Sequence, residues 1–314
     1  MTIASPVVVF LDAASMARPL RFPAGTDYRP FESTSEAQLP ARIGDAHVIV
    51  VNKVRLDQAA LAAAPRLRLI CVAAAGTDNV DVAEAQARGI EVRNAPGYGN
   101  HSVAEHVIAA TLALRRNLLV YSQAAVDGRW STSPHFCWHG PAIRDLADST
   151  MGIVGRGRIG EATASLARGL GMKVVFAATP GREKAADERD LDNLLAEADV
   201  VSLHVPLTDE TRGLISAQRL RLMKPTALLV NTARGALVDS GTLLDALGSG
   251  RLGGAAIDVL ETEPPQPHHM LLTAKMPNLL VTPHVAWASE SAQARLAGMV
   301  QDAILGFAAS RAAA

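Results

Sequence analysis

This sequence has few cysteines and no excess of positive or negative charge. Each of these two features argues against a class of protein. Two cysteines in 314 residues, Cys71 and Cys137, are too few for a disulfide scaffold and lack the spacing of zinc ligands. We expect both to be buried, reduced thiols in a cytoplasmic protein. Lys+Arg (30) and Asp+Glu (31) nearly cancel to a formal net charge of -1, which argues against a protein that coats nucleic acid.

Long apolar runs are also missing. No run approaches the roughly 18 residues needed to span a bilayer, so we expect no membrane segment. The first residues, Met1–Leu11, lack a basic stretch, which does not fit a secretory signal. With 49% apolar and 19% charged residues, the composition argues against disorder. At about 150 residues per domain, the length predicts two domains.

Strand-like and alanine-rich stretches alternate along the chain, which predicts parallel α/β sheets because parallel strands need crossover connections. The loop at Asn94–Asn100 holds one proline and two glycines and is predicted to be a hinge, with a second crossing near Trp287. Strands are predicted at Val7–Leu11, Val48–Val51, Leu67–Val72, Ile90–Val92, Met151–Val154, Lys173–Phe176, Val200–His204, Ala227–Asn231, Gly254–Val259 and Leu279–Thr282, and helices at Asp57–Ala64, Val82–Arg88 and Ser289–Ala314.

A long helix and an irregular segment are predicted between the two α/β regions. The helix should run from Val103 to Ala125, because apolar residues recur there at helical spacing and Ser102 precedes Glu105 by three residues, as in a capping box. Arg115–Asn117 is a polar interruption within it. The next segment, Asp127–Asp148, mixes aromatic residues with prolines and glycines, which favours a packed loop.

A G-x-G-x-x-G motif, Gly155 to Gly160, follows a predicted strand and opens a predicted helix. Gly155 permits a tight turn, Gly157 lets the backbone approach a pyrophosphate, and Gly160 lets the helix pack close to the strand. The free N–H groups at the helix start would face the phosphate charge. The motif therefore predicts a dinucleotide site. The alternative is a glycine turn that only packs the helix against the strand.

The residue that would bind the ribose of NAD is missing. An Asp or Glu is expected about 20 residues after the motif, at the end of the second strand. The strand Lys173–Phe176 is followed instead by Ala177 and Ala178. Arg182 or Lys184 could meet a 2′-phosphate, which favours NADP or a relaxed preference between NAD and NADP. The alternative is that both are solvated surface cations.

Three charged or titratable residues, Arg234, Glu263 and His284, follow three predicted strands of the second α/β region. Because the carboxyl ends of parallel strands share one edge, we expect these side chains to meet in one crevice. An arginine can bind a carboxylate and polarise a carbonyl, and a histidine can give a proton to a forming alkoxide. A glutamate can orient that ring and favour its protonated form. The set predicts hydride transfer from a nicotinamide to a 2-keto acid, without a metal. The alternatives are a helix cap, a solvated turn residue and a structural histidine.

The chain resembles the D-isomer-specific 2-hydroxyacid dehydrogenases over nearly its full length. The segments that carry this resemblance are Ala75–Asp81, Ser102–His106, the glycine motif, Asp199–Thr208, Met223–Pro225, Asn231–Gly235, Asp258–Pro264 and Thr282–His284. Within the family, it is most similar to the glycerate dehydrogenase and hydroxypyruvate reductase branch. The segments that carry this second resemblance are Val51–Lys53, Asn100–Val103, Leu114–Asn117, Phe136–Cys137, Ile143–Leu146 and His284–Trp287.

The resemblance implies a Rossmann-type dinucleotide-binding domain at 99–287 and a smaller flavodoxin-like α/β substrate domain formed by 1–98 and 288–314. It also implies a homodimer, with Trp138 in a loop that reaches toward the neighbouring subunit's site, and no nucleic acid or membrane partner. The residues it assigns are Arg234, Glu263 and His284 to catalysis; Ala75, Gly76, Arg234 and His284 to the substrate; and Thr77, Arg158, Ile159, Val205, Thr232, Ala233, Asp258, His284 and Ala286 to the cofactor. The predicted cofactor site also includes Gly155, Gly157 and Gly160 from the motif, and Arg182 as a contact of the 2′-phosphate.

The expected reaction is reduction of hydroxypyruvate or glyoxylate to D-glycerate or glycolate with NADH or NADPH. One alternative is a broader dehydrogenase of the pyruvate or phenylpyruvate type, which the low aromatic content (4%) disfavours. Another is a dinucleotide-sensing binding protein similar to a corepressor, built on the same fold. The complete arginine, glutamate and histidine set argues against that second alternative.

Overall fold

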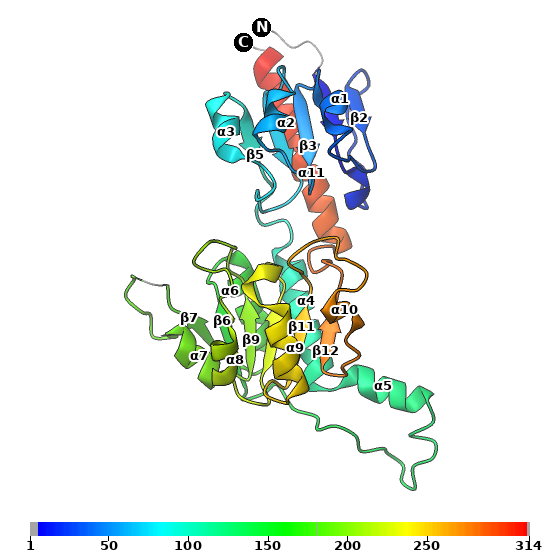
Figure 1. Cartoon of the computed structure of the whole chain (residues 1–314), viewed down its shortest axis with the longest axis vertical. Helices are drawn as coiled ribbons and strands as arrows, with labels where there is room; N and C mark the ends of the chain where they lie inside the picture. The colour runs from blue at the N-terminus through cyan, green and yellow to red at the C-terminus, as the bar shows by residue number, and fades with distance from the viewer. Residues whose placement is uncertain (1–5, 180, 313–314) are drawn as a thin grey trace. The chain divides into compact units, whose positions relative to one another are not determined.

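The computed structural model describes residues 6–179 and 181–312, and the chain divides into two compact units (Figure 1). Unit 1 comprises Met1–Gly99 with Ala288–Ala314, and unit 2 comprises Asn100–Trp287. The expected C-terminal helix forms as α11 (Glu290–Ala312), and the last two alanines of that expectation lie outside the described residues. In the described part of the chain, no helix combines the length and the apolar character needed to cross a bilayer.

Unit 1 is built on five parallel strands in the order β2-β1-β3-β4-β5. This is the flavodoxin-like order expected for the smaller domain. The edge strand β2 and helix α1 were not predicted. The elements are β1 (Val7–Phe10), η1 (Ala13–Ser15), β2 (Asp27–Pro30), α1 (Leu39–Ile43), β3 (Val48–Val51), α2 (Gln58–Ala62), β4 (Leu69–Val72), α3 (Val82–Ala87) and β5 (Glu91–Arg93).

Unit 2 is a Rossmann-type domain with seven parallel strands in the order β12-β11-β10-β9-β6-β7-β8. The order reverses between β6 and β9, which is the switch point where ligands bind in open α/β sheets. Its strands are β6 (Thr150–Val154), β7 (Lys173–Ala177), β8 (Glu188–Arg189), β9 (Val200–Leu203), β10 (Leu228–Asn231), β11 (Gly254–Ile257) and β12 (Leu279–Val281). Its helices are α4 (Asn100–Arg115), α5 (Leu118–Val126), α6 (Arg158–Gly169), α7 (Leu191–Glu197), α8 (Ala217–Leu222), η2 (Gly235–Leu237), α9 (Ser240–Gly248) and α10 (Met270–Thr273).

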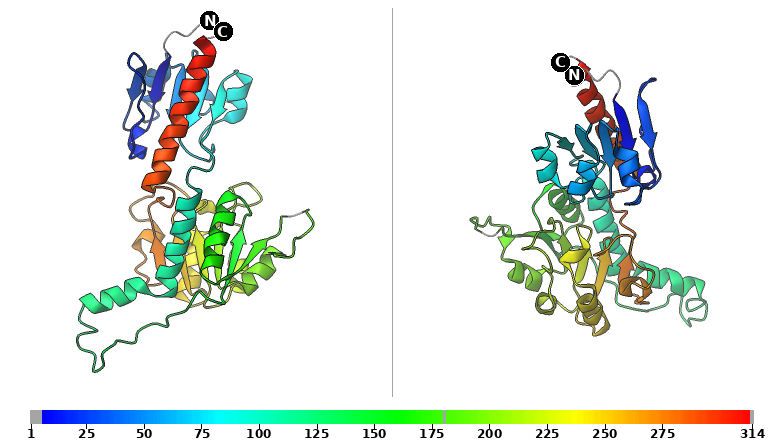
Figure 2. Two further views of the ribbon diagram at one scale, coloured as in Figure 1. Left: turned by 180° about the vertical axis from the view of Figure 1, so that it is seen from behind. Right: turned by 45° about the horizontal axis from the view of Figure 1, so that its top comes forward.

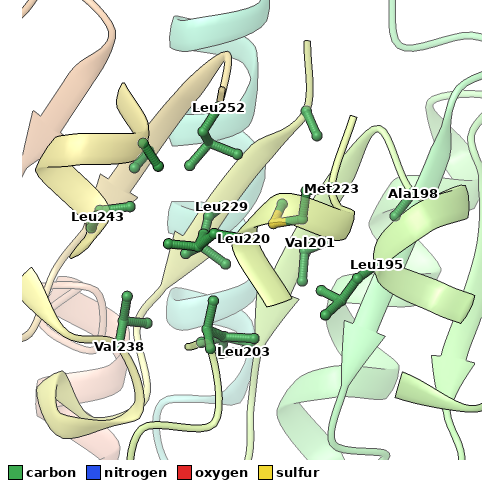
Figure 3. Close-up of a cluster of buried hydrophobic side chains, with 14 of the residues drawn as sticks. Leu195, Ala198, Val201, Leu203, Leu220, Met223, Leu229, Val238, Leu243 and Leu252 are labelled. Carbon is green, nitrogen blue, oxygen red and sulfur yellow. The ribbon is translucent and has the colours of Figure 1, made fainter. Parts of the chain in front are cut away.

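Helices cover both faces of the unit 2 sheet. Helices α4 and α6 lie on one face, as the rear view in Figure 2 shows, and their apolar side chains pack on β6, β7, β9 and β10. Helices α7, α8 and α9 cover the other face, where leucines such as Leu195, Leu220 and Leu243 meet the strand residues Val201 and Leu229 (Figure 3). Because both faces are covered, the inner strands are fully buried and mostly apolar, which is why their positions could be predicted.

The predicted long helix is broken in two, and its predicted capping box does not form. Asn117 takes a left-handed backbone conformation (φ 51) between α4 and α5, and its side chain donates to the carbonyl of Ala142 at 2.8 Å. Asparagine tolerates this conformation better than most residues. Helix α4 begins at Asn100, so Ser102 lies inside it, and its Oγ donates to the carbonyl of Ala286 at 2.7 Å. That hydroxyl therefore ties α4 to the loop after β12.

The segment Asp127–Asp148 is irregular, as expected, but most of it is exposed and not packed as predicted. With α5, this loop extends away from the rest of unit 2 (Figure 1), and we call residues 118–148 the arm. Phe136 is 92% exposed and Val126 is 81% exposed. Cys137 lies in the arm and is only half-buried, whereas Cys71 on β4 is buried as expected and its burial raises its thiol pKa to about 12.

Candidate active site

Glu263 and His284 lie together at the carboxyl edge of the unit 2 sheet. Nδ1 of His284 is 2.5 Å from Oε2 of Glu263, while Oε1 of Glu263 accepts the amide of Leu260 at 2.9 Å. A carboxylate at Nδ1 accepts a hydrogen bond from the N–H group there, which fixes the tautomer and the orientation of the ring. In the described chain no hydrogen bond or ion pair is made by Nε2 of His284, so this nitrogen can exchange a proton with a ligand.

The loop that carries Arg234 lies directly against the loop that carries Glu263. A Cβ on Gly235 would come within 2.0 Å of the carbonyl carbon of Leu260, so only glycine permits this approach. Arg234 is half-buried, its Nη1 donates to the carbonyl of Ala233 at 2.7 Å, and its own carbonyl accepts from Asn231. The structure therefore places the loops of all three predicted catalytic residues after β10, β11 and β12, which are neighbouring strands.

The three glycines of the phosphate motif meet different constraints. Gly155 has φ 110, and a Cβ there would lie 2.6 Å from the carbonyl oxygen of His204, so the turn after β6 packs against the end of β9. A Cβ on Gly160 would lie 2.2 Å from the Gly155 oxygen. Gly157 has an extended backbone (φ -95, ψ -171), and its Cβ would meet no atom of the described chain within 4 Å. Neither strain nor packing requires glycine at 157, whereas the approach of a pyrophosphate would.

Two further features fit a bound dinucleotide. Arg158 is exposed in the first turn of α6, where a cation opposes the helix dipole at a cost of about 0.3–1 kcal/mol unless an anion binds beside it. The Oγ1 of Thr232, after β10, is buried and has no hydrogen-bond partner among the residues that the structure describes. The other cofactor residues implied by the resemblance also follow strands of unit 2 or open α6: Ile159 (α6), Val205 (after β9), Ala233 (after β10), Asp258 (after β11) and Ala286 (after β12).

At the end of β7, the predicted 2′-phosphate contacts have acidic partners. Nη2 of Arg182 is 2.5 Å from Oε1 of Glu188, whose side chain is only 1% exposed, and Lys184 pairs with Asp190 at 2.6 Å. The amide of Ala185 donates to Glu188, and this bond, together with the neighbouring arginines, lowers the pKa of that carboxyl despite its burial. These cations are therefore not simply solvated, and an incoming phosphate would compete with carboxylates for them.

Ala75, Gly76 and Thr77 belong to unit 1, in the loop after β4. Asn94 supports this loop by donating to the carbonyl of Ala75 at 2.6 Å. Within residues 6–179 and 181–312, the amides of Ala75 and Gly76 donate no hydrogen bond, so both can receive an anion.

Trp138 packs within the arm. Its ring contacts Tyr121 edge-on, with centroids 5.5 Å apart, and the guanidinium of Arg129 lies 5.0 Å from the ring centre. The structure also brings in residues that sequence reasoning missed. Beside the loop that carries His284, Thr282 donates to Asp258, and His106 contacts Thr282. The only sequence signal for Thr282 and His106 was that both lie in segments that resemble the family.

An imidazole–carboxylate pair beside an arginine loop, at the carboxyl edge of a Rossmann-type sheet, is the arrangement of a nicotinamide-linked oxidoreductase. Residues 108–286 match the family model described as D-isomer specific 2-hydroxyacid dehydrogenase, NAD binding domain. The chain belongs to this family, and its enzyme class is that of the NAD(P)-dependent D-2-hydroxyacid dehydrogenases.

Named relatives agree with this membership. A glycerate dehydrogenase from Methylorubrum extorquens is 42% identical, over 97% of this chain and 96% of that protein. A hydroxypyruvate reductase from Blautia hydrogenotrophica is 37% identical, over 84% of this chain and 82% of that protein. The solved D-lactate dehydrogenase from Aquifex aeolicus, complexed with NAD and lactic acid, is similar in structure, with a TM-score of 0.82, 27% identity and coverage of 97% and 96% of the two chains.

Proposed function

We propose that this chain reduces hydroxypyruvate and glyoxylate to D-glycerate and glycolate, with NADH or NADPH. The observation that supports this most is the contact between Nδ1 of His284 and Glu263, beside the Arg234 loop. The names of the relatives, glycerate dehydrogenase and hydroxypyruvate reductase, favour a substrate with a short polar side chain.

In the proposed reaction, each of the three residues has one task. The bound nicotinamide supplies the hydride. Arg234 binds the substrate carboxylate and polarises the adjacent carbonyl. His284 gives the proton on Nε2 to the alkoxide oxygen during reduction and takes it back during oxidation. Glu263 accepts a hydrogen bond from the N–H group at Nδ1, which orients the ring so that only Nε2 exchanges protons with the substrate.

We propose that unit 2 is the dinucleotide-binding domain and unit 1 the substrate-binding domain, where the amides of Ala75 and Gly76 receive the substrate carboxylate. The cofactor would lie along Gly157, Arg158 and Thr232. We propose a relaxed preference between NADH and NADPH, because Ala178 stands after β7 where an NAD site is expected to carry Asp or Glu, while Arg182 and Lys184 already have acidic partners.

A substrate panel with an active-site variant tests this function. We expect kcat/KM for hydroxypyruvate to exceed that for pyruvate and phenylpyruvate by about tenfold or more. His284→Ala should abolish turnover while the Kd of NADH, followed by fluorescence, stays within about twofold. A tenfold preference for phenylpyruvate would contradict the substrate assignment, and turnover by the variant would contradict the role of His284. Tight NADH binding without turnover in the parent would indicate a dinucleotide sensor.

We also propose that the chain forms a homodimer through the arm. The two most exposed large apolar side chains among the described residues, Phe136 and Val126, lie in the arm together with the exposed Trp130. Exposed apolar surface of this kind marks protein contacts. Light scattering should show a dimer for the parent and a monomer for the double variant Val126→Ser/Phe136→Ser. A monomeric parent at micromolar concentration would overturn this assembly.

A further inference from the structure

A buried carboxylate holds the loop on both sides of His284. Asp258 is 3% exposed, and its Oδ1 accepts the amide of Val285 at 3.0 Å and the hydroxyl of Thr282 at 2.5 Å. Its Oδ2 accepts the amide of Ala286 at 2.9 Å. Asp258 therefore fixes Thr282 before His284 and Val285 and Ala286 after it.

His106 extends this set of contacts from α4. Its Nε2 lies 3.2 Å from Oγ1 of Thr282 and 3.9 Å from Oδ1 of Asp258. A threonine hydroxyl has a single hydrogen, and Thr282 gives that hydrogen to Asp258. Oγ1 can therefore only accept from His106, so Nε2 of His106 carries a proton. The hydrogen bonds run in one direction, from His106 to Thr282 to Asp258.

The backbone at His284 needs such support. Its φ is 53, in the left-handed region that residues with a side chain seldom adopt. Its own amide donates to the carbonyl of Asp258 at 2.8 Å. Conformations of this kind persist when the surroundings determine them strongly. On α4, Ser102 lies one turn before His106, on the same face, and also bonds this loop through the carbonyl of Ala286.

We propose that His106 is a positioning residue of this enzyme. Through Thr282 and Asp258, it fixes the imidazole of His284 where that ring exchanges its proton with the substrate. This inference rests on the proposed function, because it assigns the proton transfer to His284. It predicts that losing the donor at Nε2 slows the chemical step and leaves binding of the substrate and cofactor nearly unchanged.

Two pairs of variants test the proposal in the full-length chain. His106→Leu removes the donor, whereas the amide of His106→Gln can donate from a similar position. Thr282→Val removes the hydroxyl, whereas Thr282→Ser keeps it. We expect Leu at 106 and Val at 282 each to lower kcat for hydroxypyruvate about tenfold or more, with KM and the Kd of NADH within about twofold. The Gln and Ser variants should recover kcat to within about threefold of the parent.

A double variant separates this role from a general loss of stability. Because both residues act in one line of hydrogen bonds, His106→Leu/Thr282→Val should be no slower than the slower single variant. Full kcat in His106→Leu, or equal loss in the Leu and Gln variants, would overturn the proposal. If His106→Leu does not fold, the Thr282 pair decides, and equal kcat in Val and Ser would overturn it. Failure of the proposed function would look different, because the parent itself would then not reduce 2-keto acids.

Discussion

Nδ1 of His284 lies 2.5 Å from Oε2 of Glu263, although 21 residues separate them in the chain. Both residues follow strands, β12 and β11, that are neighbours in the sheet. The side chains are 26% and 30% exposed, so the pair is open enough for a substrate to reach and enclosed enough to stay ordered. This pair is the part of the site that a single substitution can test most directly.

Glu263→Gln should lower kcat for hydroxypyruvate by about tenfold to a hundredfold. The amide of glutamine carries no negative charge, and it can also turn an N–H group toward Nδ1, which would favour the wrong ring tautomer. The KM of hydroxypyruvate and the Kd of NADH should change little, because Glu263 acts on the histidine. Steady-state kinetics and NADH fluorescence measure these quantities. A variant with parental kcat would show that Glu263 does not orient the ring.

The phosphate motif allows a matched comparison of two glycines. Gly157→Ala should fold with the melting temperature of the parent, because its Cβ enters open space on an extended backbone. It should weaken NADH binding by about 1.4 kcal/mol or more, which is about tenfold in Kd. Gly160→Ala should lower stability by about 1–3 kcal/mol, because its Cβ would lie 2.2 Å from the oxygen of Gly155. Calorimetry and NADH titration distinguish the two, and parental NADH affinity in Gly157→Ala would place the pyrophosphate elsewhere.

The sequence was most informative where burial is complete. Strands such as β3 and β10 are fully buried, so their apolar runs stand out. Strand β2 was missed because Asp27–Pro30 is a partly exposed edge with charged residues and a proline. Local pattern also misjudged Ser102, since its hydroxyl bonds a residue 184 positions away instead of capping a helix.

The same limit applies to the candidate site. Arg234, Glu263 and His284 could be predicted because each follows a strand and parallel strands share an edge. The contact between His106 and Thr282 spans 176 positions and depends on how α4 packs on the sheet, which local pattern does not encode. The acidic partner of Arg182 was missed for a related reason, because Glu188 lies on a strand of only two residues.

Glu188→Gln should raise affinity for NADPH relative to NADH. Glutamine has no negative charge, so it binds the guanidinium of Arg182 less strongly than Glu188 does. Arg182 is 58% exposed and can turn toward a 2′-phosphate. Arg182→Ala should weaken NADPH selectively, and Arg251→Ala, at an exposed position before β11 and so at the opposite, amino edge of the sheet, serves as a matched control. Titrations with both cofactors give the ratio of Kd values. If the ratio of the Kd values is unchanged in Glu188→Gln and in Arg182→Ala, this arginine does not contact the 2′-phosphate.

The free energy of unfolding should decrease as the pH is lowered through the range in which His204 takes up a proton. Burial lowers the pKa of this histidine from 6.5 to about 4, and its Nε2 is 2.9 Å from Oγ of Ser202. Between these two values the unfolded chain binds the proton and the folded chain does not. The unfolded state therefore gains protons as the pH falls, and the free energy of unfolding decreases from about pH 6.5 to pH 4.

His204→Gln removes this titration while keeping a polar group near Ser202. Its melting temperature should therefore fall less than that of the parent between pH 6.5 and pH 4. His135→Gln, at an exposed position in the arm, should retain the acid sensitivity of the parent. Thermal denaturation followed by circular dichroism at several pH values measures both. If His204→Gln loses as much stability in acid as the parent, the half-buried histidine after β9 is not the group that makes the fold acid-sensitive.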